Sequence, residues 1–512
     1  MQKITRRTSV SLRDVFPESR IFGSRDIRVS SCSDDAGRCR NGDLFVALET
    51  ADCDGHAVAD EAVRRGAQAI LAERCLPVDV PVCVVPDSRE AYGYLCQRLV
   101  GEPSQHMRTI GVTGTNGKTI TSWMIASIFR AAGQRTGLIS SIAHSDGENT
   151  VAASRTTPAP QPLADWMARM RNNGCSASVM ELSSRSLAER QSAGVLFDVG
   201  VLTNVRRDHL DYHGSLPNYR RAKSQLFRQL KSGGVAIVNT DDPSSKFLLK
   251  HIDHPVLTVG MHIPAELNAT VIERHAGEQT FLLTAGNETV AVQTPMMGDH
   301  IVYNSMCAAA VGLVAGMDLT TIARGLESLV RVPGRLEPII GGQPFGVYVD
   351  RAGSPDTLAV ALRSLRQVTD GRVICVFGAD GRRDPSQRPL LGRVVERGAD
   401  LGIITSDNPG HEQPLQIAHD IIDGYDRPAK SHILPDRAEA IRWALSEARP
   451  GDAVLIAGKG DRQYQIIGSH RQFFDDCEIA RQWLRDVGSQ IEYEEELAQR
   501  IIPFTLASHS AN

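Results

Sequence analysis

The segment from Thr109 to Thr119, TIGVTGTNGKT, constrains the fold more than any other part of the sequence. It begins with an apolar run typical of a buried strand, and a helical pattern of apolar residues follows it from Ile120 to Phe129. Gly133 marks the end of that predicted helix. A strand, a glycine-rich turn and a helix in this order form a phosphate-binding loop, in which backbone N–H groups and the helix N-terminus face the phosphates.

The loop departs from the common GxxxxGK[ST] pattern, because Val112 stands where that pattern has its first glycine. We expect Lys118 to neutralise the β- and γ-phosphates of a bound nucleotide and the Thr119 hydroxyl to ligate Mg²⁺. A glycine-rich turn with a chance lysine is the alternative, and the flanking strand and helix disfavour it. The predicted nucleotide-binding residues of the loop are Gly114, Thr115, Asn116, Gly117, Lys118 and Thr119.

A chain of 512 residues exceeds one ordinary core, and breaks in the pattern near Pro103–His106 and Val332–Arg335 suggest three domains. We expect an N-terminal α/β domain at 1–107, a central domain at 108–333 and a C-terminal domain at 334–495, with a tail at 496–512. Strands and helices alternate through the last two domains, and this alternation predicts parallel sheets.

Strand-like runs define the predicted sheets. In the N-terminal domain they are Asp43–Leu48 and Val82–Val85, with a helix at Ala59–Gly66 between them; in the central domain Thr109–Val112, Ser178–Leu182, Val199–Thr203 and Val235–Asn239; and in the C-terminal domain Gly346–Val349, Val373–Phe377, Leu401–Thr405, His432–Leu434 and Ala453–Ala457. Four of the last group lead into polar or glycine-rich turns, DRAGSPD, GADGRRD, SDNPG and GKGDR. Ligands bind at the carboxyl ends of strands in open α/β sheets, so these turns are candidate binding segments.

Composition excludes several classes of protein. A net charge of −4 gives no basic footprint for nucleic acid, and the apolar stretch around Cys307 to Met317 is too short to span a bilayer. The first residues lack an apolar segment of the secretory kind. Ten cysteines without a CxxC pair indicate reduced thiols. We therefore expect a cytoplasmic protein without membrane insertion.

Three further segments extend the motif of the loop: RTTP at 155–158, MELSS at 180–184 and TNVRRDHLDYHG at 203–214. Together with GTNGKT, in this order, they resemble the Mur ligase family, and within it the branch that makes the UDP-N-acetylmuramoyl tripeptide. The resemblance runs from Asp43 to Phe474. Folylpolyglutamate synthetase, a relative of the family, has a similar loop.

The resemblance implies a three-domain α/β architecture with a central P-loop parallel sheet and a C-terminal Rossmann-like domain. It implies an ATP-dependent amide-bond ligase of peptidoglycan precursor synthesis. Such an enzyme adds an amino acid, by default meso-diaminopimelate, to UDP-N-acetylmuramoyl-L-alanyl-D-glutamate through an acyl phosphate. The N-terminal domain would bind the uridine nucleotide and the C-terminal domain the amino acid. We expect a monomer that uses Mg²⁺ and, apart from ATP, no organic cofactor.

The same resemblance assigns site residues, each of which has a structural explanation when taken alone. Lys223, for example, has the surroundings of an exposed helix lysine, whereas the family has a carbamylated lysine that holds a second Mg²⁺. The implied catalytic residues are Lys118, Glu181, His209 and Lys223, and the metal ligands Thr119, Glu181, His209 and Lys223. Asn304, Arg335 and Asp350 would grip the nucleotide. The implied substrate-binding residues are Thr156, Thr157, Ser183, Arg383, Asp407, Asn408 and Gly458.

Several recognition positions depart from the family pattern. Asp35-Ala-Gly37 stands for DSR, Arg185 for a histidine, Gln191 for an arginine, Arg351-Ala-Gly353 for YAH, Gly410 for the arginine of DNPR, and Asp461-Arg462 for the last two residues of GKGHE. Charge-assisted contacts to a carboxylate and to an amino group are thereby removed. Arg190, Asp461 and Arg462 are candidates for compensation.

Three hypotheses follow from these departures. The first is a working ligase of the tripeptide-forming type. The second is a related ligase of the folylpolyglutamate synthetase type, which an N-terminal module and the TTP segment disfavour. The third is a catalytically weak relative that binds nucleotide as a regulator, and the intact phosphate and metal residues argue against it.

Overall fold

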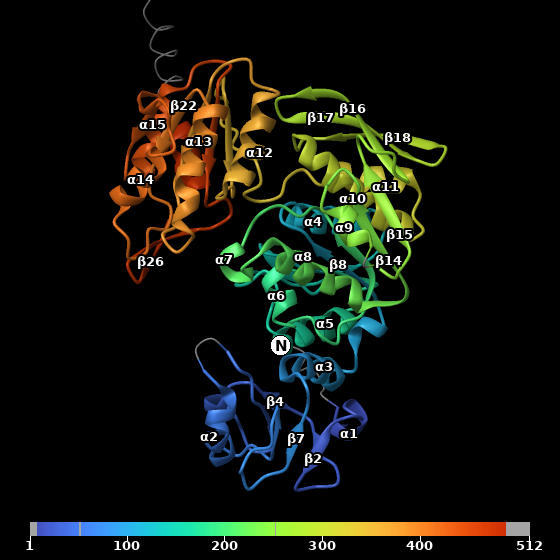
Figure 1. The fold of residues 1–512 in the computed structure, drawn as a ribbon. Coiled ribbons are helices and arrows are strands. Elements are labelled where there is room, and N and C mark those ends of the chain that lie inside the picture. Colours follow the sequence, from blue (N-terminus) through green and yellow to red (C-terminus); the bar gives the residue numbers. More distant parts are fainter. Residues whose placement is uncertain (1–7, 51–52, 251, 488–512) are drawn as a thin grey trace, which may run out of the picture. The chain divides into compact units, whose positions relative to one another are not determined.

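The computed structural model describes residues 8–50, 53–250 and 252–487, and its contacts divide the chain into two compact units. The first unit takes in most of the chain up to Val330, and the second continues from Arg331. Two short segments, 273–279 and 295–299, also belong to the second unit. The predicted tail at 496–512 lies outside the described residues. Figure 1 shows the helices and strands of both units.

The N-terminal part of the first unit is a small sheet in the order β2-β7-β6-β5-β4. All neighbours run parallel except β2, which is antiparallel to β7. The strands are β2 (Arg20–Phe22), β4 (Cys32–Ser33), β5 (Leu44–Val46), β6 (Ala69–Ala72) and β7 (Val82–Val84), and the main helices are α2 (Ala59–Arg64) and α3 (Ser88–Leu99). Asp87 caps α3 by accepting the N–H of Glu90. The two strands and the helix predicted here are confirmed, with small differences at their ends.

The remainder of the first unit surrounds a large sheet of strand order β11-β10-β9-β12-β8-β13-β14-β15-β16-β17-β18. From β9 to β16 in this order all neighbours run parallel. These strands are β8 (Arg108–Thr113), β9 (Thr136–Ile139), β12 (Ala177–Glu181), β13 (Phe197–Leu202), β14 (Leu230–Asn239), β15 (Val256–Gly260) and β16 (Leu267–His275). The central strands β8, β12 and β13 are buried almost throughout, as strands covered on both faces of a parallel sheet are. The four strands predicted for this domain are confirmed.

The two outermost strands at each end of this sheet were not among the predicted elements. They are β10 (Ala143–Ser145), β11 (Thr150–Ala152), β17 (Glu278–Ala285) and β18 (Glu288–Thr294). β10 runs antiparallel to both β9 and β11. β11 is wholly exposed and β17 alternates between buried and half-buried residues, so neither presents the continuous apolar run of a central strand.

Helices of the first unit place the loop and its neighbours. They are α4 (Lys118–Ala131), α5 (Pro160–Asn172), α6 (Ser184–Ala188), α7 (Leu210–His213), α8 (Leu216–Ser224), α9 (Ser245–Leu249), α10 (Asp299–Val314) and α11 (Leu319–Glu327). The helix α4 lies against β9 and β12 on one side and against α11 on another. Its apolar residues are therefore buried almost throughout. This packing holds the N-terminus of α4 close to the end of β8, one short loop away.

The second unit is an open α/β sheet in the order β19-β20-β24-β21-β22-β23. Apart from the short β19, all neighbours are parallel. The strands are β19 (Glu337–Pro338), β20 (Gly346–Asp350), β21 (Val373–Phe377), β22 (Leu401–Ile404), β23 (Ser431–Ile433) and β24 (Ala453–Ala457), with the helices α12 (Pro355–Arg366), α13 (Arg388–Gly398), α14 (Pro414–Ile422) and α15 (Arg437–Glu447). The five strands predicted for this domain are confirmed.

Helices cover both faces of this sheet. Val373, Cys375 and Phe377 of β21 belong to one apolar cluster, which α12, α13 and α14 complete. Ile374 and Val376 of the same strand belong to another, to which α15 contributes. Side chains alternate between the two faces of a strand, so each face needs its own helices.

The carboxyl ends of the parallel strands β20, β21, β22 and β24 lie at one edge of this sheet, so the four predicted turns that follow them meet there. Among the described residues, no helix is both long enough and apolar enough to cross a membrane.

Candidate active site

Residues 114–119 form a tight loop between β8 and α4, and close contacts require two of its glycines. Gly114 has φ +153°, and a Cβ there would lie 1.9 Å from the hydroxyl of Thr203. Gly117 has φ +86°, and a Cβ there would lie 2.2 Å from Oδ1 of Asn304. Both glycines are therefore explained by backbone conformation and by packing, Gly114 against Thr203 just after β13 and Gly117 against Asn304 of α10.

Two residues after β13 hold the loop by its backbone. Thr203 donates a hydrogen bond to the carbonyl oxygen of Asn116 at 2.6 Å. Oδ1 of Asn204 accepts the N–H of Asn116 at 3.0 Å, and its carbonyl oxygen accepts the N–H of Thr115 at 2.9 Å. The loop is thus shaped by the protein itself. Sequence reasoning does not single out Thr203 or Asn204, although both stand at the start of the TNVRRDH motif.

Lys118 and Lys223 meet over the loop. Lys118 Nζ donates to the carbonyl oxygens of Gly114 and Thr115 at 3.1 and 2.8 Å. Lys223, from α8, donates to the same Gly114 oxygen at 2.6 Å. Burial, together with the charge of Lys118, holds the pKa of Lys223 well below its usual value of 10.5, although Asp208 acts in the opposite direction. The structure therefore brings the two predicted lysines together.

Glu181, the last residue of β12, lies beside the start of α4. Both of its carboxylate oxygens are 3.1 Å from the Thr119 hydroxyl, and one accepts the N–H of Ser141 at 2.9 Å. Among the described residues, no group of three or more His, Cys, Asp or Glu side chains could hold a metal ion. A carboxylate and a hydroxyl suit Mg²⁺, which takes oxygen ligands and keeps several waters or substrate oxygens. Thr119 and Glu181 fit such an ion.

Two histidines lie in the segment after β13. His209 precedes α7 with φ +53°, its side chain is 59% exposed, and its Nε2 lies 3.5 Å from a carboxylate oxygen of Asp208. Its role as a metal ligand stays a prediction. His213 is buried, with Nε2 3.0 Å from the Ser184 hydroxyl, and burial and the Lys223 charge lower its pKa. Sequence reasoning does not single out His213.

The predicted TTP and ELSS segments meet at the end of β12. Thr157 is buried and donates to the carbonyl oxygen of Glu181 at 2.9 Å. Ser183 caps α6 by accepting the N–H of Ser186 at 3.0 Å. Thr156 is half-buried. These contacts position Glu181, and a role in substrate binding stays a prediction for Thr156, Thr157 and Ser183.

In the second unit, Asp350 and Arg335 have separate partners. Asp350, at the end of β20, accepts the N–H groups of Leu336 and Ala352 at 2.7 Å each. Burial raises its pKa, although Arg335 lowers it. Arg335 lies 3.2 Å from a carboxylate oxygen of Asp461. Contacts of Asp350 and Arg335 with a nucleotide stay predictions.

Three predicted substrate-binding residues cluster around a buried lysine. Lys459 Nζ lies 3.3 Å from Oδ1 of Asp407, and burial lowers its pKa while Asp407 raises it. Oδ1 of Asn408 lies 3.3 Å from the same amine. Gly458 has φ +117°, and a Cβ there would lie 3.1 Å from the other Asp407 oxygen. The turns after β22 and β24 are therefore joined.

Two altered recognition positions contact each other. Arg351, in the turn after β20, lies 3.0 Å from a carboxylate oxygen of Asp461, in the turn after β24. Arg335 also contacts Asp461, so this carboxylate is already neutralised. Arg383 donates to the carbonyl oxygen of Gly353 at 3.0 Å. Asp461 therefore contacts two cations and is poorly suited to replace a carboxylate that holds an amino group.

In the first unit, Arg185, at an altered recognition position, and Arg190, beside the altered Gln191, also form contacts within the protein. Arg185 pairs with Glu189 at 2.6 Å. Arg190 donates to Oε1 of Gln225 at 2.8 Å and lies 3.8 Å from Asp87. These contacts hold both arginines, and compensation by Arg190 stays a prediction.

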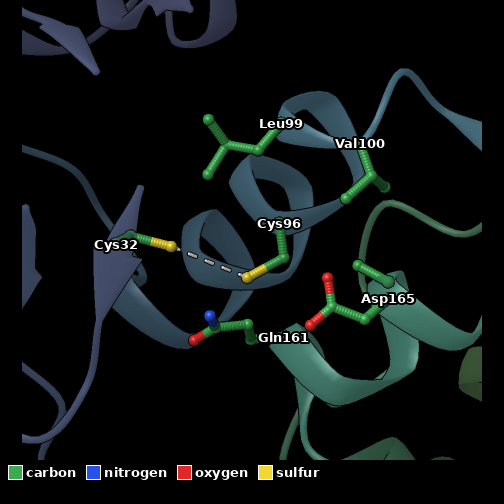
Figure 2. Close-up of a pocket in the computed structure, with 7 residues that line it drawn as sticks. Cys32, Cys96, Leu99, Val100, Gln161 and Asp165 are labelled. Carbon is green, nitrogen blue, oxygen red and sulfur yellow. Dashed lines mark hydrogen bonds between the residues drawn. The ribbon is translucent and has the colours of Figure 1, made fainter. Parts of the chain in front are cut away.

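A small pocket lies away from the loop, between α3 and α5 (Figure 2). The sulfur atoms of Cys32 and Cys96 are 3.9 Å apart there. The lining residues are Cys32, Cys96, Leu99, Val100, Gln161, Ala164 and Asp165. None of the predicted site residues lines this pocket.

Comparisons with known proteins agree with this geometry. The model of the Mur ligase middle domain matches residues 112–312, and that of the Mur ligase glutamate ligase domain matches residues 334–460. The UDP-N-acetylmuramoyl-L-alanyl-D-glutamate–2,6-diaminopimelate ligase of Geobacillus kaustophilus (strain HTA426) is 42% identical over 89% of this chain and 94% of its own length. The enzyme of the same name from Geobacillus thermodenitrificans (strain NG80-2) is 41% identical over 86% and 91%.

A solved structure of a ligase of that name covers 94% of this chain and 100% of its own, with 30% identity and a TM-score of 0.69. A phosphate-binding loop on a parallel sheet, a carboxylate–hydroxyl pair beside it and a separate glutamate ligase domain define an ATP-dependent ligase. The chain belongs to the Mur ligase family.

Proposed function

We propose that the chain joins an amino acid to UDP-N-acetylmuramoyl-L-alanyl-D-glutamate in peptidoglycan precursor synthesis, with 2,6-diaminopimelate as the default amino acid. The meeting of Lys118, Lys223 and Glu181 at one phosphate-binding loop is the observation that supports this most directly. The proposed substrates are those in the names of relatives that share about two fifths of the residues of this chain. We also propose that the protein is a monomer and works in the cytoplasm.

The proposed reaction has two steps. A substrate carboxylate attacks the γ-phosphate of ATP, giving an acyl phosphate and ADP, and the amine of the incoming amino acid then displaces phosphate. Lys118, at the N-terminus of α4, would stabilise the charge on the transferring phosphoryl group together with the loop N–H groups. Hydrogen bonds with Thr203 and Asn204 hold the loop backbone, and a loop that the protein itself holds in place needs little reorganisation during the reaction.

Thr119 and Glu181 would hold a Mg²⁺ ion, because together they present a hydroxyl and a carboxylate at 3.1 Å from each other. When bound, such an ion offsets the negative charge that ATP and a substrate carboxylate bring together. His209 is proposed as a further ligand. Thr157 and Ser186 would keep the end of β12 in place, because Thr157 bonds both the Glu181 carbonyl and the Ser186 hydroxyl.

Lys223 is proposed to be carbamylated. A carbamate forms when a neutral amine attacks carbon dioxide, so a lysine with a low pKa is the suitable form. The product is an anion, and it would relieve the repulsion between the Lys118 and Lys223 amines. It could then serve as a ligand for a second Mg²⁺.

Asn304 is proposed to contact the nucleotide. Its Nδ2 is buried, and among the described residues it has no hydrogen-bond partner. Its Oδ1 lies close to Gly117 of the loop. A buried donor without a partner is unfavourable, and an acceptor on a bound nucleotide would satisfy it. Arg335 and Asp350 are proposed as further nucleotide residues.

Arg383, Asp407, Asn408 and Gly458 are proposed to receive the incoming amino acid, because they lie at the carboxyl ends of the parallel strands. The test is phosphate release from ATP and Mg²⁺ with UDP-N-acetylmuramoyl-L-alanyl-D-glutamate and a series of amino acids. Turnover that requires both the dipeptide and an amine is expected. Nucleotide binding without turnover for any amine would overturn the proposal and favour a regulatory relative.

A further inference from the structure

Three acids in the turns after β21, β22 and β24 already have basic partners: Asp380, Asp407 and Asp461. Asp461 lies within 3.2 Å of Arg335 and 3.0 Å of Arg351. The two guanidinium groups more than balance its charge. An ammonium group of a ligand would have to compete with both of them for this carboxylate.

The other two acids are paired in the same way. Oδ1 of Asp407 lies 3.3 Å from the fully buried Nζ of Lys459. Asp380 lies 3.3 Å from Nε of Arg382. None of these carboxylates is therefore left with uncompensated negative charge.

Among residues 8–50, 53–250 and 252–487, two guanidinium groups beside these pairs have no acidic partner. Arg383 donates a hydrogen bond to the carbonyl oxygen of Gly353 at 3.0 Å, and it forms no ion pair with any described residue. Arg462 is half-buried, and in the part of the chain that the structure describes its guanidinium has neither a hydrogen bond nor an ion pair. Burial lowers the pKa of Arg462, and the neighbouring charges of Arg351 and Arg383 add to this.

A half-buried cation without a counterion is unfavourable in a folded chain, so the presence of Arg462 at this place points to an anionic partner from outside the chain. The position of Arg462, in the turn after β24, is consistent with an external ligand, because ligands of open α/β sheets bind at the carboxyl ends of the strands. A guanidinium matches a carboxylate with two parallel hydrogen bonds.

We propose that Arg462 and Arg383 bind the carboxylates of an amino dicarboxylic acid, which makes Arg462 a specificity-determining residue for the incoming substrate. This inference rests on the proposed function and narrows its substrate class. Because Asp461 and Asp407 are already neutralised, the site recognises carboxylates and does not require a second ammonium group.

The first test compares three amino acids in the complete reaction. 2-Aminopimelate has both carboxylates of 2,6-diaminopimelate but one amine, and L-lysine has two amines but one carboxylate. Turnover of 2-aminopimelate should be within about threefold of that of diaminopimelate, whereas L-lysine should fall by about tenfold or more in kcat/KM. Equal use of L-lysine, or failure of 2-aminopimelate, would overturn the inference.

The second test removes the guanidinium with Arg462→Met. KM for the amino acid should rise about 10- to 100-fold, while KM for ATP and for the UDP-linked dipeptide should stay within about twofold. The Tm of the variant should be equal or higher, because an unpaired cation is removed. Arg393→Met, on the exposed face of α13, is the matched control and should change neither KM. An unchanged KM for the amino acid in Arg462→Met would refute the assignment.

A third measurement stays informative if no amino acid is turned over. Pimelate carries two carboxylates and no amine, so its binding tests the arginines without any reaction. Millimolar pimelate should raise the Tm of the full chain and of Arg393→Met, but not that of Arg462→Met. The same Tm shift in all three proteins, or in none, would overturn the carboxylate site.

Discussion

The side-chain nitrogen of Lys223 lies 2.6 Å from the carbonyl oxygen of Gly114, the oxygen to which Lys118 also donates at 3.1 Å. Two amines therefore share one acceptor, and Lys223 is only 1% exposed. If both amines carried a proton at the same time, their positive charges would repel each other strongly, because little water surrounds them. Burial first, and the charge of Lys118 second, lower the pKa of Lys223 and so favour its neutral amine.

Lys223→Met should flatten the pH dependence of stability. The unfolded lysine keeps its proton up to about pH 10.5, whereas the folded amine releases it at lower pH. Between the folded and unfolded pKa values the unfolded state binds more protons, so wild-type stability falls as the pH falls through this window. The difference in slope should reach about 1.4 kcal/mol per pH unit.

Calorimetric Tm values between about pH 6 and 10, in buffer free of carbon dioxide, would measure this effect. Lys231→Met is the control, because Lys231 pairs with Asp198 at 2.8 Å in the same unit and should keep the wild-type pH profile. Parallel profiles for wild type and Lys223→Met would show that the folded pKa of Lys223 is ordinary.

Glu181→Gln keeps the shape of the side chain beside Thr119 but removes its charge. A neutral amide is a poor ligand for Mg²⁺, so kcat/KM should fall about 10- to 100-fold and the Mg²⁺ concentration for half-maximal activity should rise. Titration of the activity with Mg²⁺ measures both effects. Glu189→Gln, which removes the partner of Arg185, should leave the Mg²⁺ dependence unchanged. The idea fails if both variants respond alike.

Local sequence patterns were sufficient for the frame of the site. The strand β8, the loop and α4 follow one another in the chain, so Lys118 and Thr119 could be placed from glycines and helical spacing alone. Glu181 stands at the end of a buried apolar run, and parallel register with β8 brings it to the loop. Contacts between neighbouring elements of a regular sheet are thus predictable.

Contacts made by other side chains depend on tertiary packing and could not be predicted. The residues around Lys223 indicate an exposed helix lysine, and that local interpretation is wrong because α8 packs this face against the loop. Asn304 reaches Gly117 from a helix far along the chain. Arg351 and Asp461 contact each other only because β20 and β24 are neighbours in the sheet. A single sequence does not reveal such pairs.

Gly117→Ala should weaken ATP binding by about tenfold or more. The new methyl group would lie 2.2 Å from Oδ1 of Asn304 and would also be strained at φ +86°, so the loop must move. Gly133→Ala is the matched control, because Gly133 has φ +72° at the other end of α4 but no atom within 4 Å of the added carbon. It carries similar backbone strain without the clash.

Calorimetric titration with a non-hydrolysable ATP analogue separates the two effects. Both variants should lose some thermal stability, since each forces an alanine into the left-handed region. Only Gly117→Ala should lose affinity. Equal affinities for wild type and Gly117→Ala would mean that the loop tolerates the methyl group and does not cradle phosphates in this shape.

Asp476→Ala should be among the most destabilising single substitutions in the second unit. Arg437 and Asp476 are both fully buried and are joined by two hydrogen bonds of 2.8 and 2.7 Å, and Arg437 also donates to the carbonyl oxygen of Ala457. Removing the carboxylate leaves a buried cation without a counterion, which costs about 3 to 5 kcal/mol. Thermal unfolding of the full chain should show an early transition.

The double variant Arg437→Met with Asp476→Leu should be more stable than Asp476→Ala alone, because it removes the charge together with its partner. Glu478→Gln tests the same kind of pair at the surface. The Arg485–Glu478 pair lies at 2.9 Å with both side chains more than half exposed, so its loss should change the unfolding free energy by less than about 0.5 kcal/mol. If Asp476→Ala were as mild as Glu478→Gln, the Arg437 charge would have to be satisfied by Ala457 and its other neighbours alone, and the buried pair would not be what holds the start of α15 to the segment around Asp476.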